Sequence, residues 1–230
     1  GKILAIGLTF THIFRTVFFP VLARLIGLSE ERSTASRRYA EVVLFFGGLV
    51  ALGGFLLAPE ILVIVFGEAY GGAETALRLL MVNLLFAHFV ALYQTQLLAW
   101  NLQKSQMVIM VAGAAFNLVL NVVFIPRFGI EAAAATTLAS SLLVFILAGT
   151  SLHRHGYDLH SGLVAGTAAI CMVLGAGGFA LMDAAAFQSV HPLARFALWG
   201  AVISALYLGV ALLLGTIRPR EFLSYIRREI

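Results

Sequence analysis

The feature that most constrains this chain is a set of long apolar runs without charges, clearest between residues 99 and 141. Two such segments, at about 106–125 and 132–152, flank the turn sequence Pro-Arg-Phe-Gly at 126–129. About 20 apolar residues at a rise of 1.5 Å per residue cross a hydrocarbon core of roughly 30 Å. The region is therefore predicted to be a membrane hairpin and not the core of a soluble domain.

Seven segments of this kind follow one another along the chain. They lie at about 3–22, 42–66, 79–99, 106–125, 132–152, 162–182 and 196–215. Runs of this length without alternating polarity favour helices over β-strands. Only 11% of the 230 residues are charged, against about 25% in soluble domains. The predicted fold class is an all-α, polytopic membrane protein with seven transmembrane helices. In the loop before the second segment, Ser29 is expected to cap a short surface helix whose first turn carries Glu30 and Glu31.

Lysines and arginines divide unevenly between the two sets of loops. Ten fall on one side, in the loop at 21–41, at Lys104, at Arg154 and in the tail at 216–230, and four fall on the other. Cytoplasmic loops carry the excess of positive charge, so we expect the C-terminus inside and the N-terminus outside. An odd number of spans with an outside start indicates that further helices precede Gly1, and the chain is interpreted as part of a longer protein.

Several function classes find no support in the sequence. The net charge of +4 does not come with basic and aromatic residues interleaved on one polar face, so nucleic acid is not an expected partner. The single cysteine, Cys171, allows no internal disulfide. Histidines at 153, 155 and 160 lie in a loop without a supporting cysteine or carboxylate cluster, so no metal site is predicted. With no cofactor motif and no nucleophile, base and carboxylate combination, we expect neither a cofactor nor an enzyme.

Amide side chains inside the predicted spans form two stripes. Asn83, Gln94 and Asn101 are 11 and 18 positions apart, which returns them to one side of a helix with 3.6 residues per turn. Asn117 and Asn121 are four positions apart and share a face with each other. Two readings remain open: the amides hydrogen-bond neighbouring helices, or they line a polar lumen.

Arg15 lies inside the first predicted span, nine positions before Arg24 and close to His12. An arginine at this depth costs about 2.5 to 3.5 kcal/mol on insertion scales, so it pairs with another group or faces water. Snorkelling to the cytoplasmic headgroups is the alternative. The guanidinium has the planar fork that binds phosphate oxygens, which makes Arg15, with His12, a candidate anion site.

Four passages together resemble bacterial polysaccharide flippases, the O-antigen and exopolysaccharide exporters of the multidrug/oligosaccharidyl-lipid/polysaccharide superfamily. The longest is NLVLNVVFIPRFGIEAAAATTLAS at 117–140, with its asparagine, Ile-Pro, Phe-Gly-Ile and Ala-Thr elements. The other three agree in order and spacing: FFPVLARL at 18–25, APEILVIVFGEAY at 58–70 and LLAWNLQKSQ at 97–106. The similarity covers about residues 10–150.

The resemblance implies a fold of about 14 helices in two six-helix lobes plus two further helices. Residues 1–152 would form most of the second lobe, 153–215 two peripheral helices, and 216–230 a basic cytoplasmic tail. The intact protein would move an undecaprenyl-pyrophosphate-linked oligosaccharide across the bacterial inner membrane for polysaccharide or lipopolysaccharide export. Its partners would be that lipid-linked oligosaccharide, membrane lipids and the missing N-terminal lobe. Arg15 and His12 would hold pyrophosphate, and five amides would contact sugar: Asn83, Gln94, Asn101, Asn117 and Asn121.

Alternatives stay open within and outside this superfamily. A lipid II flippase would share the same fold. A drug or ion antiporter would carry a membrane carboxylate for coupling, and Glu60, near the end of a span, is the only carboxylate within these segments. A membrane enzyme of polysaccharide assembly would need a catalytic constellation in a large outer loop, whereas the outer loops are short. A seven-helix receptor fits the number of segments, but the outer loops offer little to bind a ligand.

Overall fold

The computed structural model describes residues 2–182 and 191–215, and every regular element in these ranges is helical. In chain order the elements are α1 (Lys2–Arg24), α2 (Ser29–Leu56), α3 (Ala58–Phe66), the short 3₁₀ helix η1 (Glu68–Ala73), α4 (Glu74–Ala99), α5 (Gln103–Arg154), α6 (Ser161–Met182) and α7 (Pro192–Leu213). The all-α class is confirmed. The predicted tail at 216–230 lies outside the described residues.

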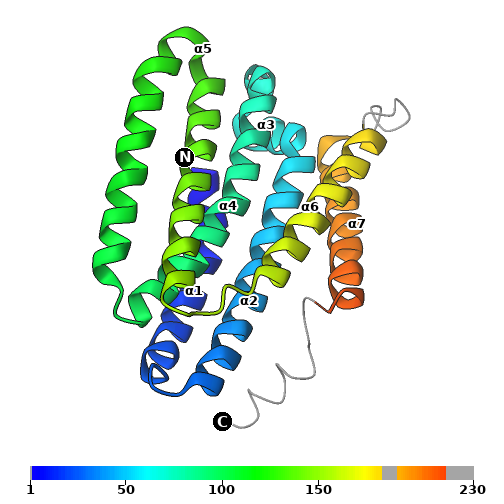
Figure 1. The fold of residues 1–230 in the computed structure, drawn as a ribbon. Coiled ribbons are helices and arrows are strands. Elements are labelled where there is room, and N and C mark those ends of the chain that lie inside the picture. The colour runs from blue at the N-terminus through cyan, green and yellow to red at the C-terminus, as the bar shows by residue number, and fades with distance from the viewer. Residues whose placement is uncertain (1, 183–190, 216–230) are drawn as a thin grey trace.

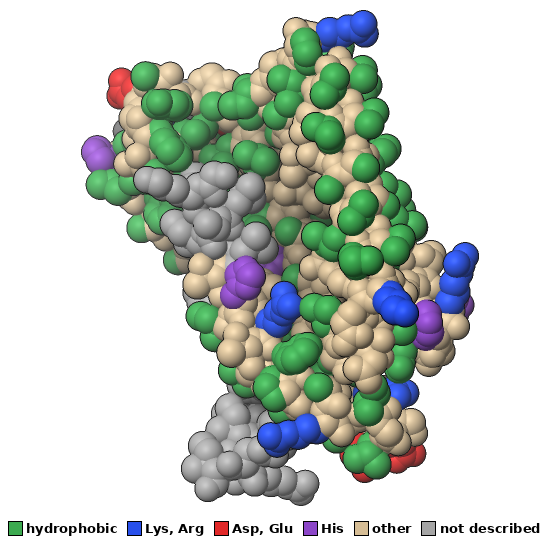
Figure 2. Space-filling view, turned by 90° about the vertical axis from the view of Figure 1, so that its left-hand side faces the viewer, with side chains coloured by type: hydrophobic (Ala, Val, Ile, Leu, Met, Phe, Trp, Pro, Cys, Tyr) green, Lys and Arg blue, Asp and Glu red, His purple; other side chains and the backbone are tan. Residues whose placement is uncertain are grey.

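Five of the described helices, α2, α4, α5, α6 and α7, are long and apolar enough to cross a membrane. Hydrophobic side chains cover most of the face that α5 presents, and lysine and arginine side chains gather in its lower half and at the upper tip (Figure 2). A surface that is apolar along its height and charged at its ends is what a bilayer requires. The chain therefore has the character of a multi-pass membrane protein.

Helix α5 is a hairpin of two antiparallel arms (Figure 1). As one straight rod, its 52 residues would be about 78 Å long, far more than a bilayer is thick. The helix instead reverses at Gly129, where φ is 64° and ψ is −139°. Glycine reaches this conformation readily because it has no Cβ, and Pro126 just before it disfavours a continuous helix. The turn predicted from the Pro-Arg-Phe-Gly sequence is confirmed.

The region between the first two predicted spans differs from the expectation. No separate surface helix forms, because helix α2 runs without interruption from Ser29 through the charged residues into the apolar segment. Ser29 is not the cap: Leu28 holds that position, and no side chain bonds the first turn. The predicted span at 42–66 is in turn divided at Leu57, where α2 ends and α3 begins with Pro59 in its first turn. Proline fits there because the first N–H groups of a helix have no internal partner.

Helix α4 lies at the centre of the bundle. It packs against α5, α2 and α1, while α6 packs mainly on α2, and α7 packs on α3 and α2. The largest apolar core joins buried residues of α2 and α4 with the second arm of α5, including Tyr39, Phe89 and Leu152. Helices α2 and α4 approach closely at Gly47, where a Cβ would lie 2.4 Å from the imidazole of buried His88. A second apolar cluster joins α2 to α6 and α7 around Leu52, Ile170 and Tyr207.

Candidate functional site

A cavity of about 450 Å³ lies between α1, α4 and α5. Helix α1 packs on α2 and α4 but makes few contacts with α5, so this space stays open. Its lining brings together four of the predicted site residues: His12 and Arg15 from α1, Gln94 from α4, and Asn117 from the first arm of α5. The sequence placed these residues in three different spans, and the fold places them around one space.

The end of the cavity formed by His12 and Arg15 is basic. His12 and Arg15 also line an adjoining hollow of about 620 Å³, which reaches Gln103 at the start of α5. Arg15 is half-buried, and among the described residues no carboxylate forms an ion pair with it. A partly desolvated guanidinium without an internal counter-ion is suited to bind an anion that enters from outside the chain.

The two arms of α5 are joined by a ladder of amide and hydroxyl groups. The Asn117 side-chain N–H group donates to Ser140 Oγ at 3.1 Å, and Asn121 donates to Asn117 Oδ1 at 2.9 Å. The Thr136 hydroxyl in turn donates to Asn121. The expected shared face of Asn117 and Asn121 is therefore present. Asn117 both joins the arms and lines the cavity, whereas Asn121 joins the arms only.

The remaining two predicted residues lie elsewhere. Asn83 is buried and accepts a hydrogen bond of 2.7 Å from Ser141 on α5, so it connects α4 to the hairpin. Asn101 does not continue the stripe of Asn83 and Gln94, because α4 ends at Ala99. It is exposed, with φ at 61°, in the connection to α5. The 18-residue spacing assumed a helix that does not extend that far.

Three hydroxyl residues on the second arm of α5 line the cavity without having been singled out: Thr137, Ser140 and Ser141. With Asn117, which bonds Ser140 directly, and Gln94 they give the cavity a lining of neutral hydrogen-bonding groups. The sequence did contain a pattern that could have identified them, since these are among the few polar residues in an otherwise alanine-rich run. Which of them faces the cavity depends on how the arms pair, which periodicity alone does not give.

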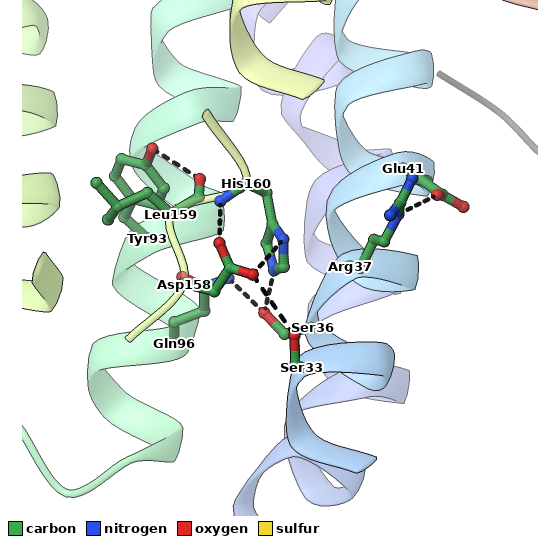
Figure 3. A network of polar contacts seen from close by, with 9 residues as sticks. All are labelled: Ser33, Ser36, Arg37, Glu41, Tyr93, Gln96, Asp158, Leu159 and His160. Atoms are coloured by element: carbon green, nitrogen blue, oxygen red, sulfur yellow. Dashed lines mark hydrogen bonds and ion pairs between the residues drawn. The ribbon is translucent and has the colours of Figure 1, made fainter. Parts of the chain in front are cut away.

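A second polar cluster fixes the loop between α5 and α6 to α2 and α4 (Figure 3). The Ser36 Oγ lies 2.7 Å from His160 Nε2 and accepts a hydrogen bond of 2.8 Å from Gln96. Asp158 Oδ2 lies 3.7 Å from His160 Nδ1. Burial lowers the pKa of His160, more strongly than the neighbouring Asp158 carboxylate raises it. The neutral form of His160 is therefore favoured between Ser36 and Asp158.

Ser36, His160 and Asp158 lie together in this cluster, a combination of serine, histidine and aspartate that was not apparent from the sequence. Ser36 is only 1% exposed, and the cavities between α1, α4 and α5 are lined by other residues. A nucleophile needs room for its substrate beside it. The geometry of the cluster thus fits a structural tie. Among the described residues, no group of three or more His, Cys, Asp or Glu side chains could hold a metal ion.

Glu60 is more deeply placed than its position near the end of a span suggests. It is 2% exposed, and its Oε1 accepts a hydrogen bond from Arg195 at the start of α7. Within the described ranges, this is the one ion pair between Lys or Arg and a carboxylate that joins different helices. Glu60 does not line the cavity that contains Arg15.

Comparison of the chain with models of known protein families gives no match, and comparison with curated proteins gives none either. The site is therefore interpreted from its own residues.

Proposed function

We propose that the chain is part of a flippase that moves lipid-linked oligosaccharide, with an undecaprenyl pyrophosphate carrier, across the bacterial inner membrane. The observation that carries this proposal is the composition of the cavity between α1, α4 and α5. It combines a basic end, formed by His12 and Arg15, with a wall of amides and hydroxyls, inside a bundle whose outer surface is apolar. A pyrophosphate requires cations, and sugar hydroxyls require neutral hydrogen-bonding groups.

The resemblance to polysaccharide flippases supplies the wider architecture of this proposal. Helices α1, α2, α4, the two arms of α5, α6 and α7 would give seven crossings, with the C-terminus in the cytoplasm. Residues 1–152 would form most of the second lobe of a 14-helix transporter, and α6 and α7 its peripheral pair. An N-terminal lobe would close the open side of the cavity between α1 and α5. Alternating access by two lobes around a site at mid-membrane is the usual way such transporters work.

Two observations favour this proposal over its alternatives. An antiporter would need a coupling carboxylate in the cavity, but among the described lining residues there is none, and Glu60 is paired with Arg195 elsewhere. A membrane enzyme would need an accessible catalytic group, and the Ser36 hydroxyl is buried. A lipid II flippase would use the same kind of cavity, so the sugar carried by the substrate stays open.

The test is replacement of Arg15 by alanine in the full protein in its own host, with cell-surface polysaccharide as the readout. We expect Arg15→Ala to abolish export and Arg15→Lys to retain part of it, because lysine keeps the charge without the bidentate fork. Arg24→Ala is the matched control, since Arg24 is exposed on the same helix and lines neither hollow. Membrane insertion is measured for each variant. Normal export by a correctly inserted Arg15→Ala protein would overturn the proposal.

A further inference from the structure

A second cavity, of about 440 Å³, lies on the other side of α4, between α2, α4 and α6. We call it the apolar slot. Its walls are formed by Leu52 and Phe55 of α2, Leu85 and Phe89 of α4, and Met172 and Phe179 of α6. Met172 is 73% exposed at its edge, so the slot opens sideways between α4 and α6. With the outer surface of the bundle in hydrocarbon, this opening faces the lipid phase.

One end of the slot carries a cation. The Arg78 guanidinium lies 4.5 Å from the Phe179 ring and 5.7 Å from the Phe55 ring, and both rings line the slot. Its side chain is 21% exposed and pairs with Glu74 through Nη2 at 2.6 Å. The Arg78 Nε is buried and has no hydrogen-bond partner. The guanidinium thus lies beside one end of an apolar space, with part of its side chain exposed and one buried donor without a partner.

The distance from Arg78 to the deep end of the slot matches one leaflet. On α4 the slot is lined from Met81 to Phe89, and Arg78 lies 11 positions before Phe89, about 16 Å at 1.5 Å per residue. Each leaflet contributes about half of the roughly 30 Å hydrocarbon core. An acyl chain anchored by its headgroup at Arg78 would therefore reach the deep end near Phe89.

We propose that the apolar slot binds one acyl chain of a membrane phospholipid, with the phosphodiester of that lipid at Arg78. The lining supplies the hydrophobic contact, the guanidinium supplies a charge-assisted hydrogen bond to the phosphate, and the lipid enters sideways from its own leaflet. The occupant is a structural lipid that fills the space between α6 and α4. This site is separate from the cavity that contains Arg15, and the proposal does not depend on transport.

The slot can be blocked without touching its cation. Ala176 is exposed and lines the slot, whereas Ala169 is exposed on the same helix and does not. The full chain is purified in detergent, and retained phosphatidylglycerol is counted by native mass spectrometry. We expect one lipid per wild-type chain, at least a tenfold loss of affinity in Ala176→Phe because the ring occupies the slot, and no loss in Ala169→Phe.

The cation is tested with Arg78→Gln and with two further lipids. We expect this variant to bind phosphatidylglycerol about tenfold more weakly, the scale of one lost charge-assisted hydrogen bond, and to bind uncharged diacylglycerol as the wild type does. Equal weakening for both lipids, or no weakening, would overturn the role of Arg78. Displacement of phosphatidylglycerol by an equal concentration of undecaprenyl phosphate would overturn the assignment to a phospholipid.

A measurement on the unaltered chain covers the case in which Ala176→Phe does not fold. Phosphatidylglycerol with a photoactivatable diazirine in one acyl chain is crosslinked to the wild type, and the labelled residues are mapped. We expect the label on α4 between 82 and 89 and on α6 between 171 and 179. Label spread evenly over the exposed apolar residues of α5 would overturn the proposal.

Discussion

Helices α1–α5 and the α6–α7 pair are held in place by different kinds of contact. Within α1–α5, polar side chains join neighbouring helices at several depths, as in Asn83 with Ser141 and Asn117 with Ser140. The α6–α7 pair is tied by polar groups mainly at its two ends, through His160 at one and Arg195 at the other. Between those ends its contacts with the bundle are largely apolar.

This difference shows what the polar groups are for. Side chains that hydrogen-bond inside a membrane bundle stabilise it by only about 0.6 to 2 kcal/mol each, so an apolar interface of the α6 type is sufficient for assembly. Polar groups at several depths in α1–α5 therefore indicate a polar space, and Asn117 and Ser140 do line the cavity. The α6–α7 pair instead meets the rest of the bundle through a largely apolar interface.

Among the changes that test the difference between α1–α5 and the α6–α7 pair, Glu60→Gln is expected to lower the free energy of unfolding most. Removing one partner of a buried ion pair costs about 3 to 5 kcal/mol, and we expect about 3 kcal/mol of unfolding free energy because Arg195 is 23% exposed. Glu74→Gln is the control: its pair with Arg78 is more exposed, and such pairs contribute below about 1 kcal/mol. Both are measured by denaturant unfolding in detergent micelles. Similar losses of unfolding free energy in the two variants would show that the pair of Glu60 with Arg195 does not hold the start of α7 in place.

The second-largest loss of stability is expected from a bulkier side chain at Gly113, between the two arms of α5. A Cβ at Gly113 would lie 2.3 Å from Val144 Cγ2 on the other arm, whereas one at Gly177 would meet nothing within 4 Å. Overpacking of this kind costs about 1 to 3 kcal/mol, so Gly113→Val is expected to be less stable by that amount, and Gly177→Val is expected to be close to the wild type apart from helix propensity. If thermal unfolding does not separate the two variants, the arms are not packed as closely as described.

The polar ladder of α5 is tested by Asn117→Leu. The change leaves Asn121 and Ser140 without one of their partners, and we expect a loss of about 1 kcal/mol of unfolding free energy. Asn101→Gly, which removes an exposed amide outside the ladder at a position with φ of 61°, is expected to have almost no effect because glycine accepts this conformation. A more stable Asn117→Leu protein would mean that the ladder is costly, and that Asn117 is present only for the cavity.

The smallest effect is expected from pH at the other end of the α6–α7 pair. The pKa of His160 is lowered from its ordinary 6.5 by burial, with Asp158 raising it and Arg37 lowering it. The neutral form is thus favoured by the fold, so stability is complete above about pH 6.5 and declines as pH falls toward the folded-state pKa. Melting temperatures at pH 7.5 and 5.5 measure this decline. We expect His160→Gln to reduce it and His155→Gln, at an exposed site, to leave it unchanged.

The parts of the fold that could be predicted from the sequence are those that depend on neighbours along the chain. Apolar run length predicted the helices, and Pro126 with Gly129 predicted the reversal of α5. Local signals were weaker at helix ends: the charged residues after Ser29 continue α2, and the end of α4 at Ala99 excludes Asn101 from the stripe.

For the site, the sequence identified which residues were costly in a membrane but not which would meet. His12, Arg15, Gln94 and Asn117 were selected separately, and their common cavity depends on how α1, α4 and α5 pack. The pairing of Glu60 with Arg195 spans 135 positions, and the contact of His160 with Ser36 spans 124. Composition and periodicity carry no information about such distant pairs.

The tight reversal of α5 at Gly129 also bears on how this hairpin reaches its place during biogenesis. The segment that must cross the bilayer between the two arms is short, and its charged residues are Arg127 and Glu131. Moving one elementary charge through a membrane potential of 100 mV takes about 2.3 kcal/mol, but one positive and one negative charge moving together transfer no net charge. With both arms spanning the bilayer as proposed, the tip would be translocated without net work against the potential, and both arms could insert as one unit.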